Sequence, residues 1–320
     1  PGIYRAWFSL GARVAAAQLA AMLLSFVLFL LMVERVSRGR ARYNNTTGRN
    51  RPLAGARLGG LGSLLAVVAC SLPLLLGFVL PAVLLLKMAL TEGDAQFGAR
   101  FLLLSRNSFL LAGITACIGV LLALLMAYGA RLSKSTLASG LNRLVGLGYA
   151  VPGAVIAVGV LIPVTRLDNW LAGQWEHWFG SNPGLLLTGG IAALIYAYLV
   201  RFLAVALHTV ESSLAKITPN MDDAARCLGL GQGETLRRVH APMLRGSLFT
   251  AGLLVFVDVM KELPATLVMR PFNFDTLATQ TYTLAADERL AEASTAALAI
   301  VAVGLLPLIA LSRQVSRARK

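Results

Sequence analysis

Three ionisable residues stand in the middle of a long apolar stretch of this sequence. Asp258, Lys261 and Glu262 interrupt the run GSLFTAGLLVFVDVMKELPATLVM, and Pro264 follows them. In lipid such groups are costly, and they normally face a bundle interior or a water-filled cavity. Their spacing places all three on one side of a helix, which Pro264 should kink or interrupt. Two interpretations follow: an Asp258–Lys261 ion pair that fixes helix packing, or a cluster that lines or gates a translocation pathway.

No other residues have the spacing of a catalytic or metal-ligand cluster. No phosphate-binding loop occurs, so any ATP and Mg²⁺ that the protein depends on would have to be bound by another chain. We therefore expect a protein that is not an enzyme, with no cofactor and no metal site of its own. The histidines are dispersed and form no ligand set, and the cysteines are interpreted as small buried apolar residues: His177, His208, His240, Cys70, Cys117 and Cys227.

Composition indicates an integral membrane protein. Of 320 residues, 57% are hydrophobic and 14% are charged, with a mean hydropathy of +0.71. Soluble domains carry about 25% charged residues. The net charge of +14 could suggest nucleic acid. However, the basic residues cluster in short loops between apolar runs, which is typical of cytoplasmic loops, so we expect membrane lipid and no nucleic acid as a partner.

Seven apolar segments are long enough to cross a bilayer as helices, which takes roughly 20 residues each. Because lipid cannot satisfy backbone polar groups, and the runs show no alternation of period two, the predicted fold is an all-α polytopic membrane protein. The segments cover about residues 13–33, 62–86, 107–129, 144–165, 184–208, 247–269 and 293–312.

The distribution of Lys and Arg predicts the orientation. Basic residues crowd the loops after the first and third segments and the tail, whereas the alternate loops hold most of the acids. The positive-inside rule therefore places the C-terminus and the loop at 209–246 in the cytoplasm. Arg201 falls near the cytoplasmic end of the fifth segment, where its side chain can extend to the interface.

The loop contains a short segment with helical signals. Pro219 suits an early helical position after a cap at Thr218 or Asn220, and Gly229 is where a left-handed C-terminal cap would fall. A helix of about nine residues is not stable alone in water, so its apolar stripe should lie against something. Two acids, Asp222 and Asp223, lie in the first turn, where the helix dipole favours anions, and the stripe comprises Met221, Ala224, Ala225 and Leu228.

The longer stretch NMDDAARCLGLGQGETLRRVHAP, Asn220–Pro242, resembles the EAA loop of permease subunits of binding-protein-dependent ABC importers. That motif runs roughly E-A-A-x3-G-x9-I-x-L-P, and the spacing fits throughout. Three letters depart conservatively: Asp223 for Glu, Val239 for Ile and Ala241 for Leu.

The resemblance implies a helical bundle of the ABC importer permease (MetI-like) type, in a bacterial inner membrane. The partners it implies are a cytoplasmic ABC ATPase dimer and a periplasmic substrate-binding protein. In that family the loop forms a coupling helix that docks into a cleft of the ATPase, and Asp223 and Gly229 are the most diagnostic positions. The coupling residues carried over are Met221, Asp222, Asp223, Ala224, Ala225, Leu228, Gly229 and Pro242.

A second stretch, KELPATLVMRPFNFDTLAT, resembles permeases of the fused ferric-iron type. Asp258, Lys261, Glu262 and Pro264 are then candidate pathway or gate residues. Two acids against one base would leave a negative site, which is compatible with an iron cargo. Related permeases for thiamine, polyamines, sulfate or molybdate stay open as alternatives. An ion-coupled secondary transporter is the other class, and it would explain the charges but not the EAA-like loop.

Two segments near the two ends of the chain have similar sequences, and this similarity bears on domain organisation. Residues 13–17, RVAAA, and 36–38, VSR, resemble residues 289–293, RLAEA, and 315–317, VSR. Either this is a chance similarity or the first helix closes a preceding, similar permease half that is fused N-terminally. On the second interpretation, 1–33 is the last helix of that half, 34–60 an Arg-rich cytoplasmic linker, 61–312 a six-helix permease domain and 313–320 a basic cytoplasmic tail.

Overall fold

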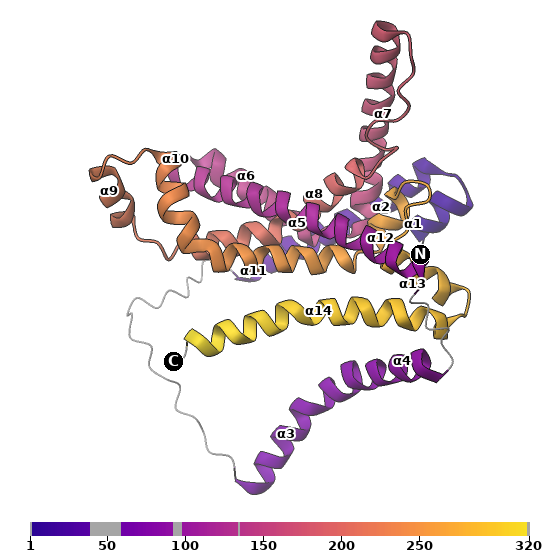
Figure 1. Cartoon of the computed structure of the whole chain (residues 1–320), viewed down its shortest axis with the longest axis horizontal. Helices are drawn as coiled ribbons and strands as arrows, with labels where there is room; N and C mark the ends of the chain where they lie inside the picture. Colours follow the sequence, from indigo (N-terminus) through magenta and orange to yellow (C-terminus); the bar gives the residue numbers. More distant parts are fainter. Residues whose placement is uncertain (1, 39–58, 92–97, 134, 319–320) are drawn as a thin grey trace.

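The computed structural model describes residues 2–38, 59–91, 98–133 and 135–318, and within these ranges the regular elements are all helices (Figure 1). Most of the Arg-rich linker and the last two residues of the tail lie outside the described residues. The short elements are α1 (Gly2–Tyr4), η1 (Arg5–Ser9), η2 (Leu75–Val79), η3 (Leu147–Ala150), α10 (Gln232–Thr235), η4 (Leu236–His240) and α12 (Pro264–Met269). The longer ones are α2 (Arg13–Arg38), α3 (Gly60–Leu74), α4 (Leu80–Thr91), α5 (Ala99–Ser133), α6 (Thr136–Gly146), α7 (Gly153–Phe179), α8 (Ala192–Leu214), α9 (Pro219–Cys227), α11 (Ala241–Met260), α13 (Leu277–Ala286) and α14 (Leu290–Ala318).

The core is formed where α5, α8 and α11 pack against one another. Their contact faces combine large buried side chains with many alanines, which let helix backbones approach closely in a membrane protein. Figure 1 shows these three helices side by side, with α9 and α10 at one end of the bundle and α13 at the other. Members of this core include Leu111, Ala112, Ala116, Ala123, Leu194, Ala197, Leu207, Ala251 and Val255.

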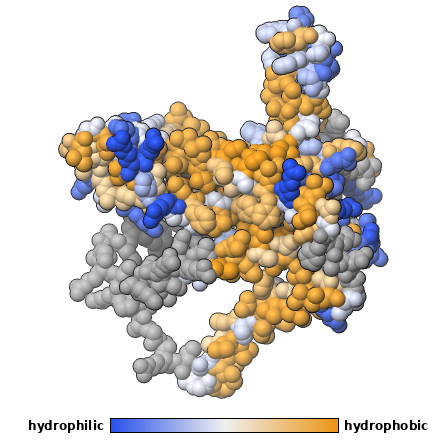
Figure 2. Space-filling view, in the orientation of Figure 1, coloured by the Kyte–Doolittle hydropathy of each residue, from blue (hydrophilic) through white to orange (hydrophobic). Residues whose placement is uncertain are grey.

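Seven stretches within the described residues are long and apolar enough to cross a bilayer, which confirms the predicted number. Much of the remaining surface is apolar, as Figure 2 shows, and α3 and α4 expose most of their large hydrophobic side chains. A bilayer or another helical unit would cover such a surface. All three cysteines are exposed, so the prediction that they are buried was wrong.

Two predicted boundaries were wrong because one acid is used internally. We ended the fourth segment at residue 165, before polar residues, and began the fifth at 184. Helix α7 instead continues to Phe179, and Asp168 on it is fully buried. The Asp168 carboxylate accepts backbone N–H bonds at 2.7–3.0 Å from Leu186, Leu187 and Thr188. These bonds order the connection, and α8 therefore begins only at Ala192.

The sixth segment also has other bounds than the predicted 247–269. Its helical stretch begins at Gln232, inside the polar loop, and α11 ends at Met260. Lys261 follows as the C-cap, and Pro264 occupies an early position of the separate helix α12. Since Pro264 has no N–H and cannot continue α11, the predicted interruption is observed. The helices α6 and α13 were not predicted.

Candidate functional site

The helix predicted in the polar loop is α9, at one end of the bundle (Figure 1). Thr218 is its N-cap residue without a side-chain bond, and Pro219 begins the helix. Gly229 has a φ of +80°, the left-handed value expected of a C-terminal cap. Behind it, Leu230 N–H donates to Ala225 O at 3.0 Å, a bond that closes the helix end. Local sequence therefore fixes both ends of α9.

The apolar stripe predicted on α9 is divided between two environments. Ala225 is buried against the rest of the chain. Met221, Ala224 and Leu228 are exposed, and Leu228 keeps 81% of its surface accessible. The outward face formed by these three residues is apolar, and no described part of the chain covers it. A surface of this kind on a short helix suits docking against another protein.

The two aspartates of α9 point to different surroundings. Asp223 is 64% exposed and lies 3.4 Å from Arg226 on the same helix. Asp222 is 18% exposed and accepts from Arg131, at the end of α5, at 3.1 Å from Nε and 2.7 Å from Nη2. Arg131 also donates to the carbonyl of Leu214 at 2.9 Å, so it holds the last turn of α8 as well.

His240, the last residue of η4 and the residue directly before α11, completes this arrangement. Its ring is fully buried, and Nε2 lies 2.7 Å from Asp222 Oδ1, without the alignment of a hydrogen bond. Tyr128 packs edge-on against the His240 ring and donates to the Gln232 carbonyl at 2.9 Å. We refer to Tyr128, Arg131, Asp222 and His240 as the Asp222 cluster. It joins α5, α9 and η4, which leads into α11, and Tyr128 also binds α10 through the Gln232 carbonyl.

The intramembrane acids are also separated. Asp258 and Lys261 form the expected ion pair at 2.8 Å, with Lys261 59% exposed. Glu262 lies beyond the end of α11 and is 1% exposed, and Arg201 donates to it at 2.6 Å. The three residues therefore do not share one helix side, because the helix ends between them. Arg201 points into the protein rather than toward an interface, contrary to the prediction.

Glu262 has a second role in holding α12. Its carboxylate accepts the backbone N–H groups of Ala265 at 3.0 Å and Thr266 at 3.3 Å, which are free donors in the first turn. Thr266 in turn bonds with Tyr198 of α8 at 2.6 Å. We refer to Tyr198, Arg201, Glu262 and Thr266 as the Glu262 cluster.

The predicted negative charge of the intramembrane site was wrong. The acids Asp258 and Glu262 are matched by Lys261 and Arg201, so two ion pairs balance. Charge alone therefore gives no preference for a cation. Sequence reasoning missed Arg201 as a partner because it lies about sixty positions away on another helix, and only the packing of α8 against α12 brings the two together.

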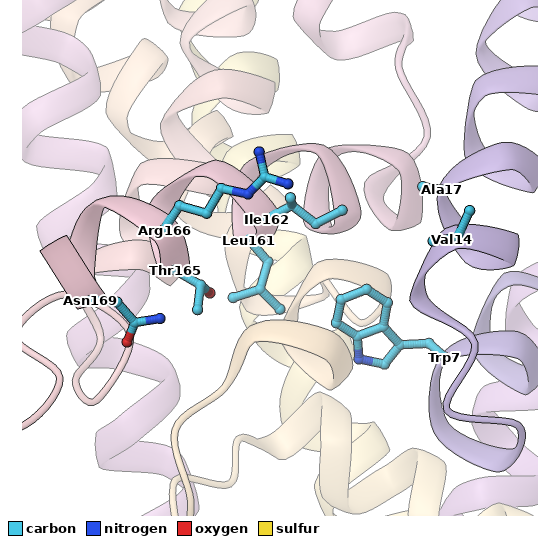
Figure 3. Close-up of a pocket in the computed structure, with 8 residues that line it drawn as sticks. All are labelled: Trp7, Val14, Ala17, Leu161, Ile162, Thr165, Arg166 and Asn169. Atoms are coloured by element: carbon cyan, nitrogen blue, oxygen red, sulfur yellow. The ribbon is translucent and has the colours of Figure 1, made fainter.

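A cavity of about 480 Å³ opens between the N-terminal helices and α7 (Figure 3). One wall is apolar, and the α7 wall carries polar side chains one turn apart. Beside it, α2 packs on α7 through Ala20, Val155 and Val158. The lining residues are Trp7, Val14, Ala17, Leu161, Ile162, Thr165, Arg166 and Asn169.

Comparison with known sequences identifies relatives of this fold. The profile of the family described as "Binding-protein-dependent transport system inner membrane component" matches residues 119–320. The Fe(3+)-transport system permease protein FbpB 2 of Haemophilus influenzae is 26% identical over 303 residues, 93% of this chain and 56% of that protein. This chain thus spans little more than half the length of that relative. The putative 2-aminoethylphosphonate transport system permease protein PhnV of Salmonella typhimurium is 25% identical over 65% of this chain and 69% of its own.

Solved structures agree on the fold. A bacterial ABC transporter involved in the import of the acidic polysaccharide alginate superimposes with a TM-score of 0.60. The match has 17% sequence identity and covers 79% of this chain and 95% of the other. The predicted helical permease bundle is therefore confirmed at the level of architecture.

Proposed function

This chain belongs to the family of binding-protein-dependent transport system inner membrane components, and we propose from that premise that it couples ATP hydrolysis to the import of ferric iron. At the coarser level it is a multi-pass inner-membrane permease of a binding-protein-dependent ABC importer. The family consists of transport components. The ATPase partners, the cargo and the orientation with a cytoplasmic C-terminus belong to the proposal.

The observation that carries the coupling role is the exposed apolar face of α9. Met221, Ala224 and Leu228 face outward on a helix whose ends are fixed by Pro219 and by the left-handed Gly229. A nine-residue helix gains little from its own hydrogen bonds, so contact with a partner is the natural use of such a face. An ATP-hydrolysing subunit would receive this face in a cleft and move α9 when ATP binds. Pro242, the last residue of the motif, lies at the start of α11, where the chain would return to the membrane.

Ferric iron is supported by the extent of the likeness to FbpB 2, which reaches over nearly the whole chain. The likeness to PhnV covers less of it and makes 2-aminoethylphosphonate the competing cargo. In either case the soluble binding protein would supply much of the selectivity. The relatives named above give no support for thiamine, polyamines, sulfate or molybdate as the cargo.

Uptake into proteoliposomes tests the cargo. The full-length protein would be reconstituted with the ATPase and the binding protein encoded beside it, and radioactive ferric iron would be offered with ATP inside. ATP-dependent accumulation that excess 2-aminoethylphosphonate does not reduce is expected. Accumulation of the phosphonate instead of iron would contradict ferric iron as the cargo, while the assignment as an ATP-driven importer would stand.

Co-purification tests the coupling role. Gly229→Arg adds a bulky cation where the backbone is left-handed, and Asp223→Lys reverses the exposed charge of α9. At matched membrane expression, both variants should lose the ATPase that the wild-type protein retains. Retention in both variants would mean that α9 is not the docking site. Absence of the ATPase from the wild type would favour an ion-coupled secondary transporter.

We also propose that a second permease half precedes this one in the same protein. The packing of α2 on α7 supports this, because α2 would then belong to the first half and mark its seam with the second. Residues 61–312 would form the second permease domain, with the linker at 34–60 and the tail at 313–320 in the cytoplasm. An upstream coding region without another EAA-like loop would refute the fused arrangement.

A further inference from the structure

The Asp222 cluster has a counterpart at the opposite end of α5. There, Asn107 donates to the carbonyl of Asp275 at 2.9 Å, and Ser108 accepts the backbone N–H of Leu277 at 2.9 Å. Asn107 and Ser108 are buried, and Leu277 is the first residue of α13. One helix is therefore bonded through its side chains to α9 at one end and to the start of α13 at the other. Figure 1 shows α5 running between these two ends of the bundle.

We propose that α5 is the rigid element that transmits movement of α9 to α13, with Asp222 and Arg131 as positioning residues at one end and Ser108 at the other. The inference rests on the proposed function, because it assumes that an ATPase moves α9. It adds a route by which that movement reaches the far side of the bundle.

The geometry of α5 suits transmission. The stretch between Ser108 and Arg131 is continuous helix with no proline. At ~1.5 Å per residue it is about 35 Å long, roughly the thickness of a bilayer core. Its alanine-rich face packs tightly against α8 and α11, which supports it along its length. A displacement at one end is therefore not absorbed by bending at a hinge within the helix.

The connection at the α9 end depends on Asp222. Helix α9 packs mainly against the short α10, and among its apolar stripe only Ala225 is buried. The Asp222 carboxylate is thus the main side-chain link from α9 to the long helices α5 and α11. At 18% exposure for both Asp222 and Arg131, the ion pair is shielded enough to be stronger than a surface pair.

A purely structural role for Asp222 makes a different prediction. If the carboxylate only stabilises the loop, its removal would lower the melting temperature and the amount of ATPase bound, and nothing else. If the carboxylate transmits movement, its removal would also reduce the structural change in α13 that each bound ATPase produces. A coupling between sites is a free energy that can be measured apart from either binding event.

Hydrogen exchange separates these roles. The full-length protein, co-purified with its ATPase in lipid nanodiscs, would be compared with and without a non-hydrolysable ATP analogue and Mg²⁺. The measurement is the change in amide exchange of Leu277–Ala286, normalised to the amount of ATPase bound. In Asp222→Asn this normalised response should fall about fivefold or more, a typical size for coupling between sites.

Matched variants keep the test decisive. Glu234→Gln neutralises another acid of the same loop, one that is 52% exposed and pairs with Arg238 at 3.4 Å, and it should behave as wild type. Asp222→Glu keeps the charge and should restore at least half of the response. Ser108→Ala removes the acceptor of the Leu277 N–H at the opposite end of α5 and should also reduce the α13 response. This variant provides a second test if Asp222→Asn folds poorly.

An unchanged normalised response in both Asp222→Asn and Ser108→Ala would overturn the inference. So would a loss in Asp222→Asn that is fully explained by less bound ATPase, because Asp222 would then belong to the docking surface. A wild-type protein that binds no ATPase would overturn the proposed function and the inference together, so the two failures are distinguishable.

Discussion

The Asp222 cluster and the Glu262 cluster use the same chemical pair in two settings. In each, an arginine on a long helix donates to a carboxylate, at 2.7 Å from Arg131 and 2.6 Å from Arg201. Asp222 is 18% exposed and belongs to a nine-residue helix, whereas Glu262 is 1% exposed and also holds the first turn of α12. Water can replace the partner of the first acid but not of the second. The difference suggests that the first pair can rearrange in function, while the second is a fixed part of the fold.

The largest expected effect is at Glu262. Replacing Glu262 by Ala leaves Arg201, whose side chain is 24% exposed, without its carboxylate and frees two N–H groups of α12. Breaking a fully buried pair by removing one partner typically costs about 3–5 kcal/mol, and the partial exposure of Arg201 places this loss toward the lower end of that range. We expect a large drop in the apparent melting temperature in detergent and in membrane yield. Asp222→Ala should lower stability less, by about 1–3 kcal/mol, because water reaches that site.

A double substitution checks the cause of this loss. In Arg201→Met with Glu262→Ala the unpaired charge is gone, so part of the stability should return. If the double variant is no more stable than Glu262→Ala, the carboxylate acts mainly through the backbone of α12. Equal losses in Glu262→Ala and Asp222→Ala would contradict the distinction between the two clusters.

The next effect concerns the close approach of α7 to the Glu262 cluster. A Cβ on Gly153 would lie 2.5 Å from Arg201 Nη1 and closer still to Glu262 Oε1, so the ion pair would have to move. Gly153→Ala should therefore lower the melting temperature, by an amount equivalent to about 1–3 kcal/mol of overpacking. Gly159→Ala on the same helix is the control, since nothing lies within 4 Å of its added Cβ. A loss of stability in Gly159→Ala as large as in Gly153→Ala would mean that helix backbone effects, not the ion pair, explain the result.

A smaller effect is expected at the α9 end. Gly229 has a φ of +80° and open space around its Cβ position, so Gly229→Ala adds backbone strain without a clash. The cost is about 1–2 kcal/mol for a non-glycine residue in this conformation. It should appear as faster amide exchange of α9 alone, with the melting temperature of the bundle nearly unchanged. A global loss of stability would show that α9 is more firmly integrated into the fold than the Asp222 cluster indicates.

Much of this architecture can be predicted from local sequence. Apolar run length predicts seven spans, and the signals at Pro219 and Gly229 predict both ends of α9. What local sequence cannot predict is how polar residues in different helices find one another. Asp168 turns inward to bind three N–H groups, and Glu262 pairs with Arg201. These choices depend on helix packing, which a single sequence does not encode in any short window.

The smallest effect on stability is expected at the Asp258–Lys261 pair, where the candidate pathway role is best tested. Lys261 is 59% exposed and three residues from Asp258 on the last turn of α11. Only Lys261 of this pair is exposed, and Asp258 is 12% exposed. A helical pair of this spacing contributes about 0.5 kcal/mol, and Asp258→Asn keeps the shape of the side chain, so this variant should express and melt nearly as wild type. If this pair lines the pathway, Asp258→Asn should lower cargo uptake per unit of protein, because a group that faces the pathway acts on the cargo rather than on the fold. Uptake and yield that fall equally would support the packing interpretation. The site would then resemble the Glu262 cluster, and the pathway would have to be sought elsewhere on the bundle.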